Sequence, residues 1–223
     1  MTQEVWTAVD QYITETLVPS DAILEAALRA SAEAGLPSIQ VSPPQGKLLH
    51  LLTRSLKART ILEIGTLGGY STIWMARALP EGGRLLTLEA DAKHADVASA
   101  NIARAGLSKV VEQRLGAALE TLPQLAAERP EPFDLIFIDA NKSTMAEYFD
   151  WALKLSKPGS MIIADNVIRD GKVIDVESKD ADVQGVRRFN ERVATERRVS
   201  ATEIQTVGSK GYDGFAVVLV LAG

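Results

Sequence analysis

Residues 60–71 read TILEIGTLGGYS, an apolar run followed by a glycine-rich turn and the start of a helical pattern. The same order recurs along the chain, with further strand-like runs at residues 84–89, 110–114, 133–139 and 160–164. Helical patterns lie between the runs, near residues 70–79, 92–105, 117–128 and 143–155. Runs such as DLIFID (134–139) and MIIAD (161–165) are almost wholly apolar, as parallel strands covered by helices on both faces are. This strict alternation predicts an α/β fold with a doubly wound, mostly parallel sheet.

The two ends of the chain depart from this alternation. About 40 residues with a helical pattern precede the first strand, and a helix near residues 181–196 is followed by strand patterns at 199–207 and 214–221. The segment GSKGYDG (208–214) between them is rich in turn residues. We therefore expect a loop that is longer than a tight hairpin turn and that joins two antiparallel strands. We predict a single domain with a helical cap (1–45) and a core (46–223).

Composition narrows the classes of function. A chain of 223 residues with 46% hydrophobic residues can bury the core of one domain. The longest apolar run, 215–222, is too short to cross a bilayer, and the N-terminus does not resemble a signal peptide, so we expect no membrane partner and a cytoplasmic location. The net charge of −5 lacks the basic footprint of nucleic-acid binding. Without cysteine and with two histidines, any metal site must use oxygen ligands.

Polar residues at the ends of the first three strands predict a binding site, because ligands of doubly wound sheets lie there. Leu67 breaks the dinucleotide pattern G-x-G-x-x-G, and Glu63 would repel phosphates but suits a cationic group such as the amino group of a methionine moiety. Glu89 can accept hydrogen bonds from a ribose, or it can be a solvated helix cap. The small residues 116–118 could admit an adenine. A glycine-rich turn with no ligand remains the alternative for residues 65–69.

Oxygen-bearing side chains also end the next two strands. Asp139 closes one and Asp165 with Asn166 closes the other, so adjacent parallel strands would bring the three together. Crowded, buried carboxylates need a compensating cation or their own protons. Two carboxylates and an amide favour Mg²⁺, with Mn²⁺ or Ca²⁺ as alternatives. Lys142 would lie at the rim, where burial and the metal charge favour a neutral amine that accepts a proton from a phenol. The competing interpretation is that both aspartates only cap the following loops.

Taken in order, LEIGTLGGYSTIWMARAL (62–79), LEAD (88–91), FIDANK (137–142) and ADN (164–166) resemble the metal-dependent class I O-methyltransferases, the family of catechol and caffeoyl-CoA O-methyltransferases. The resemblance extends from VSPPQG (41–46) to GYDGF (211–215). It implies S-adenosylmethionine (SAM) as cofactor, a divalent metal, a seven-stranded sheet with the last strand antiparallel, and a homodimer. The implied substrate is a small phenol with two neighbouring hydroxyls.

The resemblance also implies a role for each matching residue. Asp139, Asp165 and Asn166 would be the metal ligands, and Lys142 the base. The implied cofactor contacts are Val41, Glu63, Gly65, Thr66, Tyr70, Ser71, Glu89, Ala118 and Asp139. Two positions depart from the plant caffeoyl-CoA enzymes, which have an aspartate at Asn141 and an aromatic residue at Arg169. A cation at position 169 can pair with an acidic substrate or face solvent, and the polar stretch 169–182 is the expected acceptor-side loop.

Three other functions stay open at this point. A relative that methylates a modified tRNA base would bind RNA in a salt-sensitive manner. A nucleotide-dependent oxidoreductase would bind NAD(P), but the sequence lacks the G-x-G-x-x-G pattern typical of such binding. A non-catalytic module would bind the cofactor without turnover, although the predicted set of metal ligands and base is complete.

Overall fold

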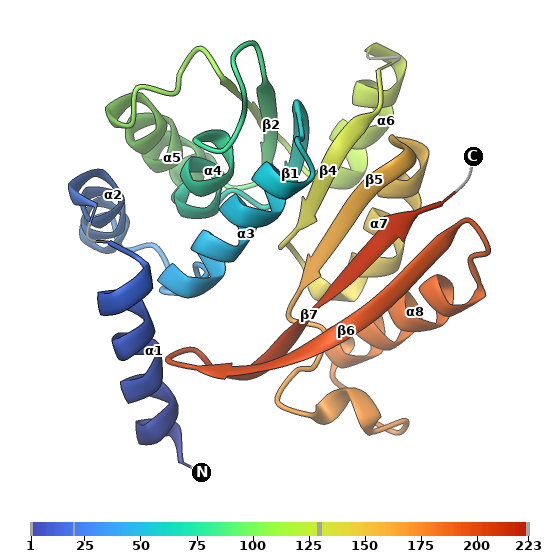
Figure 1. Ribbon diagram of the computed structural model, residues 1–223. Helices are drawn as coiled ribbons and strands as arrows, with labels where there is room; N and C mark the ends of the chain where they lie inside the picture. The colour runs from blue at the N-terminus through green and yellow to red at the C-terminus, as the bar shows by residue number, and fades with distance from the viewer. Residues whose placement is uncertain (1, 20, 129–130, 222–223) are drawn as a thin grey trace.

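The computed structural model describes residues 2–19, 21–128 and 131–221. Its centre is a seven-stranded sheet in the order β3-β2-β1-β4-β5-β7-β6 (Figure 1). The strands are β1 (Thr60–Ile64), β2 (Arg84–Glu89), β3 (Val111–Leu115), β4 (Phe133–Ile138), β5 (Ser156–Asp165), β6 (Val199–Gly208) and β7 (Gly211–Val220). Strands β1 to β5 pair in parallel, whereas β7 runs antiparallel to both β5 and β6. The predicted fold class, including the antiparallel last strand, is confirmed.

Helices cover both faces of this sheet (Figure 1). The helices are α1 (Gln3–Leu17), α2 (Ala22–Glu33), α3 (Pro43–Ser55), α4 (Tyr70–Ala76), α5 (Ala92–Arg104), α6 (Ala118–Glu128), α7 (Met145–Lys154) and α8 (Ala181–Thr195), with 3-10 turns η1 (Lys142–Thr144) and η2 (Lys172–Ile174). Alternate residues of β1 face opposite layers: Ile61 packs in the layer of α3 and α4, and Leu62 in the layer of α6, α7 and α8. Both faces of the central strands are therefore buried, which explains why their sequences are apolar throughout.

The last two strands form a tight hairpin. The prediction of a long loop at residues 208–214 is therefore wrong. Only Ser209 and Lys210 separate β6 from β7, and Gly211 takes the positive φ of 97°. Because glycine turns the chain there without steric cost, the following residues join the strand. Tyr212 and Asp213 accordingly pair with Val207 and Thr206. Strand β5 likewise begins at Ser156, four residues before its expected start.

The tip of this hairpin holds the N-terminal helices. Gln3 Nε2 donates to the Gly208 carbonyl at 2.8 Å, and Ser209 donates through its backbone N and Oγ to Asp10 at 2.8 and 2.9 Å. Lys210 Nζ donates to the carbonyl of Ser38 at 2.9 Å. These contacts hold helix α1 and the segment before α3 beside the sheet edge. The expected cap boundary at residue 45 falls inside α3, and the division into cap and core stays a prediction. Within the described ranges, no helix is long and apolar enough to span a membrane.

Candidate active site

A cavity of about 490 Å³ opens at the carboxyl ends of β1, β2, β4 and β5. It is lined by ten of the twelve predicted site residues, namely Val41, Gly65, Thr66, Tyr70, Ser71, Glu89, Ala118, Asp139, Lys142 and Asn166. The side chains of Glu63 and Asp165 lie beneath this lining and are both buried. Residues from the loop before α3 to the segment after β5 thus meet in one place, as expected for ligands of a doubly wound sheet.

The turn after β1 brings the backbone of β1 against that of β4. Gly65 has a φ of 103°, and a Cβ there would overlap the carbonyl oxygen of Asp139. Gly69 has a φ of 80° at the N-terminus of α4. A side chain at position 65 would therefore both strain the turn and displace Asp139. Gly65 thus allows two strand ends of the protein to approach each other, whereas the predicted close approach of the glycine-rich turn to a ligand stays a prediction.

Glu63 reaches the cavity only through its partners. Its two carboxylate oxygens accept hydrogen bonds from Ser71 Oγ at 2.6 Å and from Thr72 Oγ1 at 2.5 Å. Complete burial raises the pKa of Glu63 to about 7, although the two hydroxyls oppose the shift. The carboxyl holds Ser71 at the start of α4, where Ser71 faces the cavity. Its direct contact with a ligand stays a prediction.

Replacing Glu63 by glutamine is expected to flatten the pH dependence of stability in the ligand-free protein. A carboxyl with a raised pKa binds its proton more tightly when folded, so its contribution is full below about pH 4.5 and falls until about pH 7. One such group changes the unfolding free energy by about 1.4 kcal/mol per pH unit in that window. Urea unfolding at pH 5, 6 and 7 would measure the difference. Parallel losses for both proteins across the window would contradict it.

Glu89 joins the ends of β1 and β2. One oxygen accepts from the backbone N of Thr66 and Leu67 at 3.2 and 2.8 Å, and the other from Ala90 and Asp91 at 3.0 Å. Four backbone donors thus fix the carboxylate at the cavity wall. Because a carboxylate offers about four lone-pair sites, these donors already use them, and a ribose hydroxyl would share an oxygen with a backbone donor. The predicted contact between Glu89 and a ribose stays a prediction.

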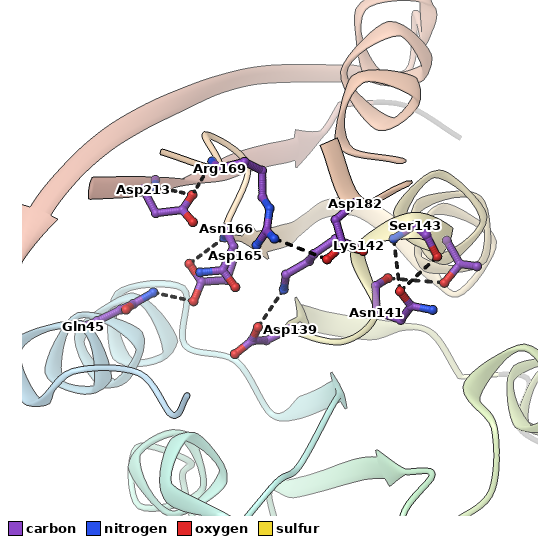
Figure 2. Close-up of polar contacts among 12 residues, drawn as sticks. Gln45, Asp139, Asn141, Lys142, Ser143, Asp165, Asn166, Arg169, Asp182 and Asp213 are labelled. Atoms are coloured by element: carbon purple, nitrogen blue, oxygen red, sulfur yellow. Dashed lines mark hydrogen bonds and ion pairs between the residues drawn. The ribbon is translucent and has the colours of Figure 1, made fainter. Parts of the chain in front are cut away.

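Asp139, Asp165 and Asn166 gather at the other end of the cavity (Figure 2). Asp165 accepts hydrogen bonds from Gln45 Nε2 at 2.8 Å and from the backbone N of Asn166 at 2.9 Å. Burial, and then the negative charge of Asp139, hold the pKa of the Asp165 carboxyl well above its usual range. A cation between the two carboxylates would remove this conflict, so the donors fit a hard divalent ion. Across the described part of the chain, no three His, Cys, Asp or Glu side chains cluster for a metal, and this set contains only two.

Lys142 is buried and donates from Nζ to Asp139 Oδ1 at 2.8 Å. Asn141 Oδ1 accepts from the backbone N and Oγ of Ser143 at 3.2 and 3.0 Å, so it caps the turn η1 that carries Lys142. Helix α8 packs directly on this turn, because a Cβ on Gly185 would overlap the Lys142 carbonyl. The ammonium group is therefore positioned by its own turn and by a helix 40 residues further along the chain.

Comparison with known proteins agrees with this geometry. Residues 14–218 match the O-methyltransferase family. The chain belongs to that family. It is 56% identical to a catechol O-methyltransferase of Niastella koreensis, over 99% of this chain and 100% of the relative. It is 50% identical to a catechol O-methyltransferase of Mycobacterium tuberculosis, over 95% and 94% of the two chains.

Two solved structures of O-methyltransferases are similar to this O-methyltransferase in fold and sequence. An O-methyltransferase from Bacillus cereus in complex with SAH has a TM-score of 0.97 and 59% identity, over 98% of this chain and 100% of that one. The O-methyltransferase TomG from Streptomyces achromogenes, in complex with SAM, has a TM-score of 0.95 and 54% identity, over the whole of both chains. The predicted family and enzyme class are confirmed.

Sequence reasoning missed several residues of the O-methyltransferase site. Gln45 holds Asp165, Thr72 shares Glu63 with Ser71, and Gly185 supports the turn of Lys142. Asp182 and Tyr148 also line the cavity. Gln45 and Thr72 stand inside the motifs 41–46 and 62–79, so their position was a usable signal. Asp182 ends the polar stretch 169–182 that was expected on the acceptor side, whereas Gly185 lies in an ordinary helical pattern with no such signal.

Proposed function

We propose that this O-methyltransferase transfers the methyl group of SAM to one hydroxyl of a small phenol with two neighbouring hydroxyls, assisted by a divalent metal, Mg²⁺ foremost. The observation that carries the proposal is the pair of carboxylates, Asp139 and Asp165, next to Asn166 and Lys142 at the end of a ligand-sized cavity. The names of the relatives and the SAM and SAH bound to two solved relatives support it.

The first three strand ends would hold the cofactor. Ser71, kept in place by Glu63, offers a hydroxyl to the amino-acid end, and Gly65 leaves its backbone open to it. Glu89 would accept the ribose hydroxyls. Val41 and Tyr70 are buried beside the cavity and would exclude water around the sulfonium, and Ala118 would border the adenine.

Asp139, Asp165 and Asn166 would hold the metal. A bound divalent cation supplies a positive charge that lowers the pKa of a neighbouring phenol. Lys142 Nζ would take the hydroxyl proton or stabilise the phenolate oxygen, which bonds to the methyl carbon as the carbon–sulfur bond breaks and leaves a neutral thioether. Because the reacting groups need little covalent help, positioning and electrostatics would supply most of the acceleration.

The deciding experiment is to incubate the enzyme with SAM and a panel of vicinal diphenols, with Mg²⁺ or with excess chelator, and to detect products by mass spectrometry. Product that forms with Mg²⁺ and disappears with chelator would support the proposal. Product that forms equally well with chelator would refute the role of the metal, and O-methylation would stand. Binding of SAM without turnover of any diphenol would refute vicinal diphenols as the acceptors.

We also propose a homodimer. Helix α1 exposes Val5, Val9 and Tyr12, and the neighbouring edge strand β6 exposes Ile204 and Val207, which together give apolar surface on connected elements. Light scattering after gel filtration would give twice the mass of the chain. The cytoplasmic location stays a prediction.

A further inference from the structure

We infer that Arg169 selects acceptors that carry an anionic substituent, such as a ring carboxylate, in addition to the two hydroxyls. The inference rests on the proposed function and names the class of its acceptor. It starts from the position of one guanidinium group, which lines the same cavity as Lys142 and Asn166.

The backbone at Arg169 is held so that its side chain returns to the cavity. Asp213 Oδ1 on β7 accepts from the backbone N of Ile168 and of Arg169 at 2.9 and 3.0 Å. Arg169 has a φ of 55°, in a region that non-glycine residues adopt rarely. Such a conformation persists only where the surroundings enforce it, and here it turns the chain sharply after β5. Figure 2 shows the side chain of Arg169 running from Asp213 toward Lys142 and Asp182.

Among the residues that the structure describes, the Arg169 guanidinium has one ionic partner, and it has spare donors. Arg169 Nη2 lies 3.3 Å from Asp182 Oδ2 in the first turn of α8, and the Arg169 side chain is 28% exposed. A guanidinium carries five N–H donors in a planar fork, and this single contact uses one of them. Asp182 therefore orients Arg169 and leaves an edge of the fork open to a ligand.

The balance of charge at this end of the cavity favours an anion. A divalent cation held by Asp139 and Asp165 would balance their two negative charges. Among the described residues that line this end of the cavity, the other charged side chains are Lys142 in its protonated form, Arg169 and Asp182, whose charges sum to one positive charge. A carboxylate fits this excess, because arginine binds it through two parallel hydrogen bonds. A neutral or cationic ring substituent would gain no such contact.

The test compares two acceptors that share the diol and differ in charge, 3,4-dihydroxybenzoate and 3,4-dihydroxybenzyl alcohol. We expect the native enzyme to prefer the benzoate in kcat/KM. In Arg169→Gln the ratio of benzoate to alcohol should fall about 10- to 100-fold, the loss expected for a hydrogen-bonded charged group. The loss should lie mainly in KM, because the substituent is remote from the reacting atoms. Arg169→Lys should fall between the two.

Two further variants make the result specific. Asp182→Asn should raise the ratio, because it removes a negative charge that repels a bound carboxylate while its amide oxygen still accepts from Arg169 Nη2. Arg84→Gln makes the same charge change at the opposite end of β2 and should leave the ratio unchanged. An unaltered ratio in Arg169→Gln, or an equal loss for both acceptors, would overturn the inference and leave Arg169 as a tie between its loop and α8. If Arg169→Gln did not fold, an unchanged or lower ratio in Asp182→Asn would overturn it. Turnover of neither acceptor by the native enzyme would refute the proposed function itself, and the inference with it.

Discussion

Replacing Asp165 by asparagine is expected to lower kcat/KM about 10³-fold, since a metal that stabilises the reacting oxygen contributes several kcal/mol. The substitution keeps the shape of the side chain and its contact with Gln45 but removes a negative charge from the ligand set. We also expect that Mg²⁺ raises the melting temperature of the native enzyme, because the ion binds only the folded ligand set. The variant should lose this shift. Differential scanning fluorimetry with Mg²⁺ or chelator, beside initial rates, measures both effects.

Asp134→Asn is the matched control for this prediction. Asp134 lies near the start of β4, at the opposite end of the sheet, and pairs with Lys157 Nζ at 2.6 Å. Asp134→Asn should keep the Mg²⁺-dependent rise in melting temperature. A full Mg²⁺ shift in Asp165→Asn would show that the ion binds elsewhere.

Replacing Lys142 by methionine is expected to lower kcat by about 10² to 10⁴, the range for a positioned proton-transfer group. Methionine retains most of the apolar stem, and the chain keeps Asp139, Asp165 and Asn166 in place. Binding of SAM, measured by calorimetry, should therefore remain within a few-fold of the native value, because Lys142 serves the acceptor. The loss should appear in kcat with single-turnover kinetics.

Lys109→Met makes the same change in an exposed lysine beside the start of β3 and should retain native kcat. If Lys142→Met kept native turnover at neutral pH, the amine would have no part in the proton transfer. A loss of SAM binding equal to the loss of rate would instead point to a damaged cofactor site.

The sheet was predictable because its information is local. The central strands are mostly apolar on both faces and each is followed by its own helix, so their parallel direction follows from the sequence. The site was predictable for a related reason, since parallel strands end at one edge and the polar residues at those ends must meet there. The prediction for the hairpin at Ser209 was wrong because turn-forming residues also fit at the ends of strands. Only the pairing with the partner strand decides how far each strand extends.

What the sequence did not reveal depends on contacts between distant segments. Gln45 and Asp165 are 120 residues apart, and Arg169 meets Asp182 across a loop. Glu63 was expected to face a ligand directly, and its burial beneath Ser71 and Thr72 depends on how α4 packs on β1. Such contacts leave no periodic pattern in the chain, so only the assembled fold locates them.

The contacts between the hairpin tip and the N-terminal segment limit the order in which the parts of the enzyme can fold. Asp10 and Ser209 are joined across 199 residues, and Lys210 Nζ donates to the carbonyl of Ser38, just before Val41, which lines the cavity. During synthesis the first helices leave the ribosome long before their partner exists. The contact that holds the segment before Val41 therefore forms only after β6 and β7 have been synthesised, so this wall of the cavity depends on folding at the far end of the sheet.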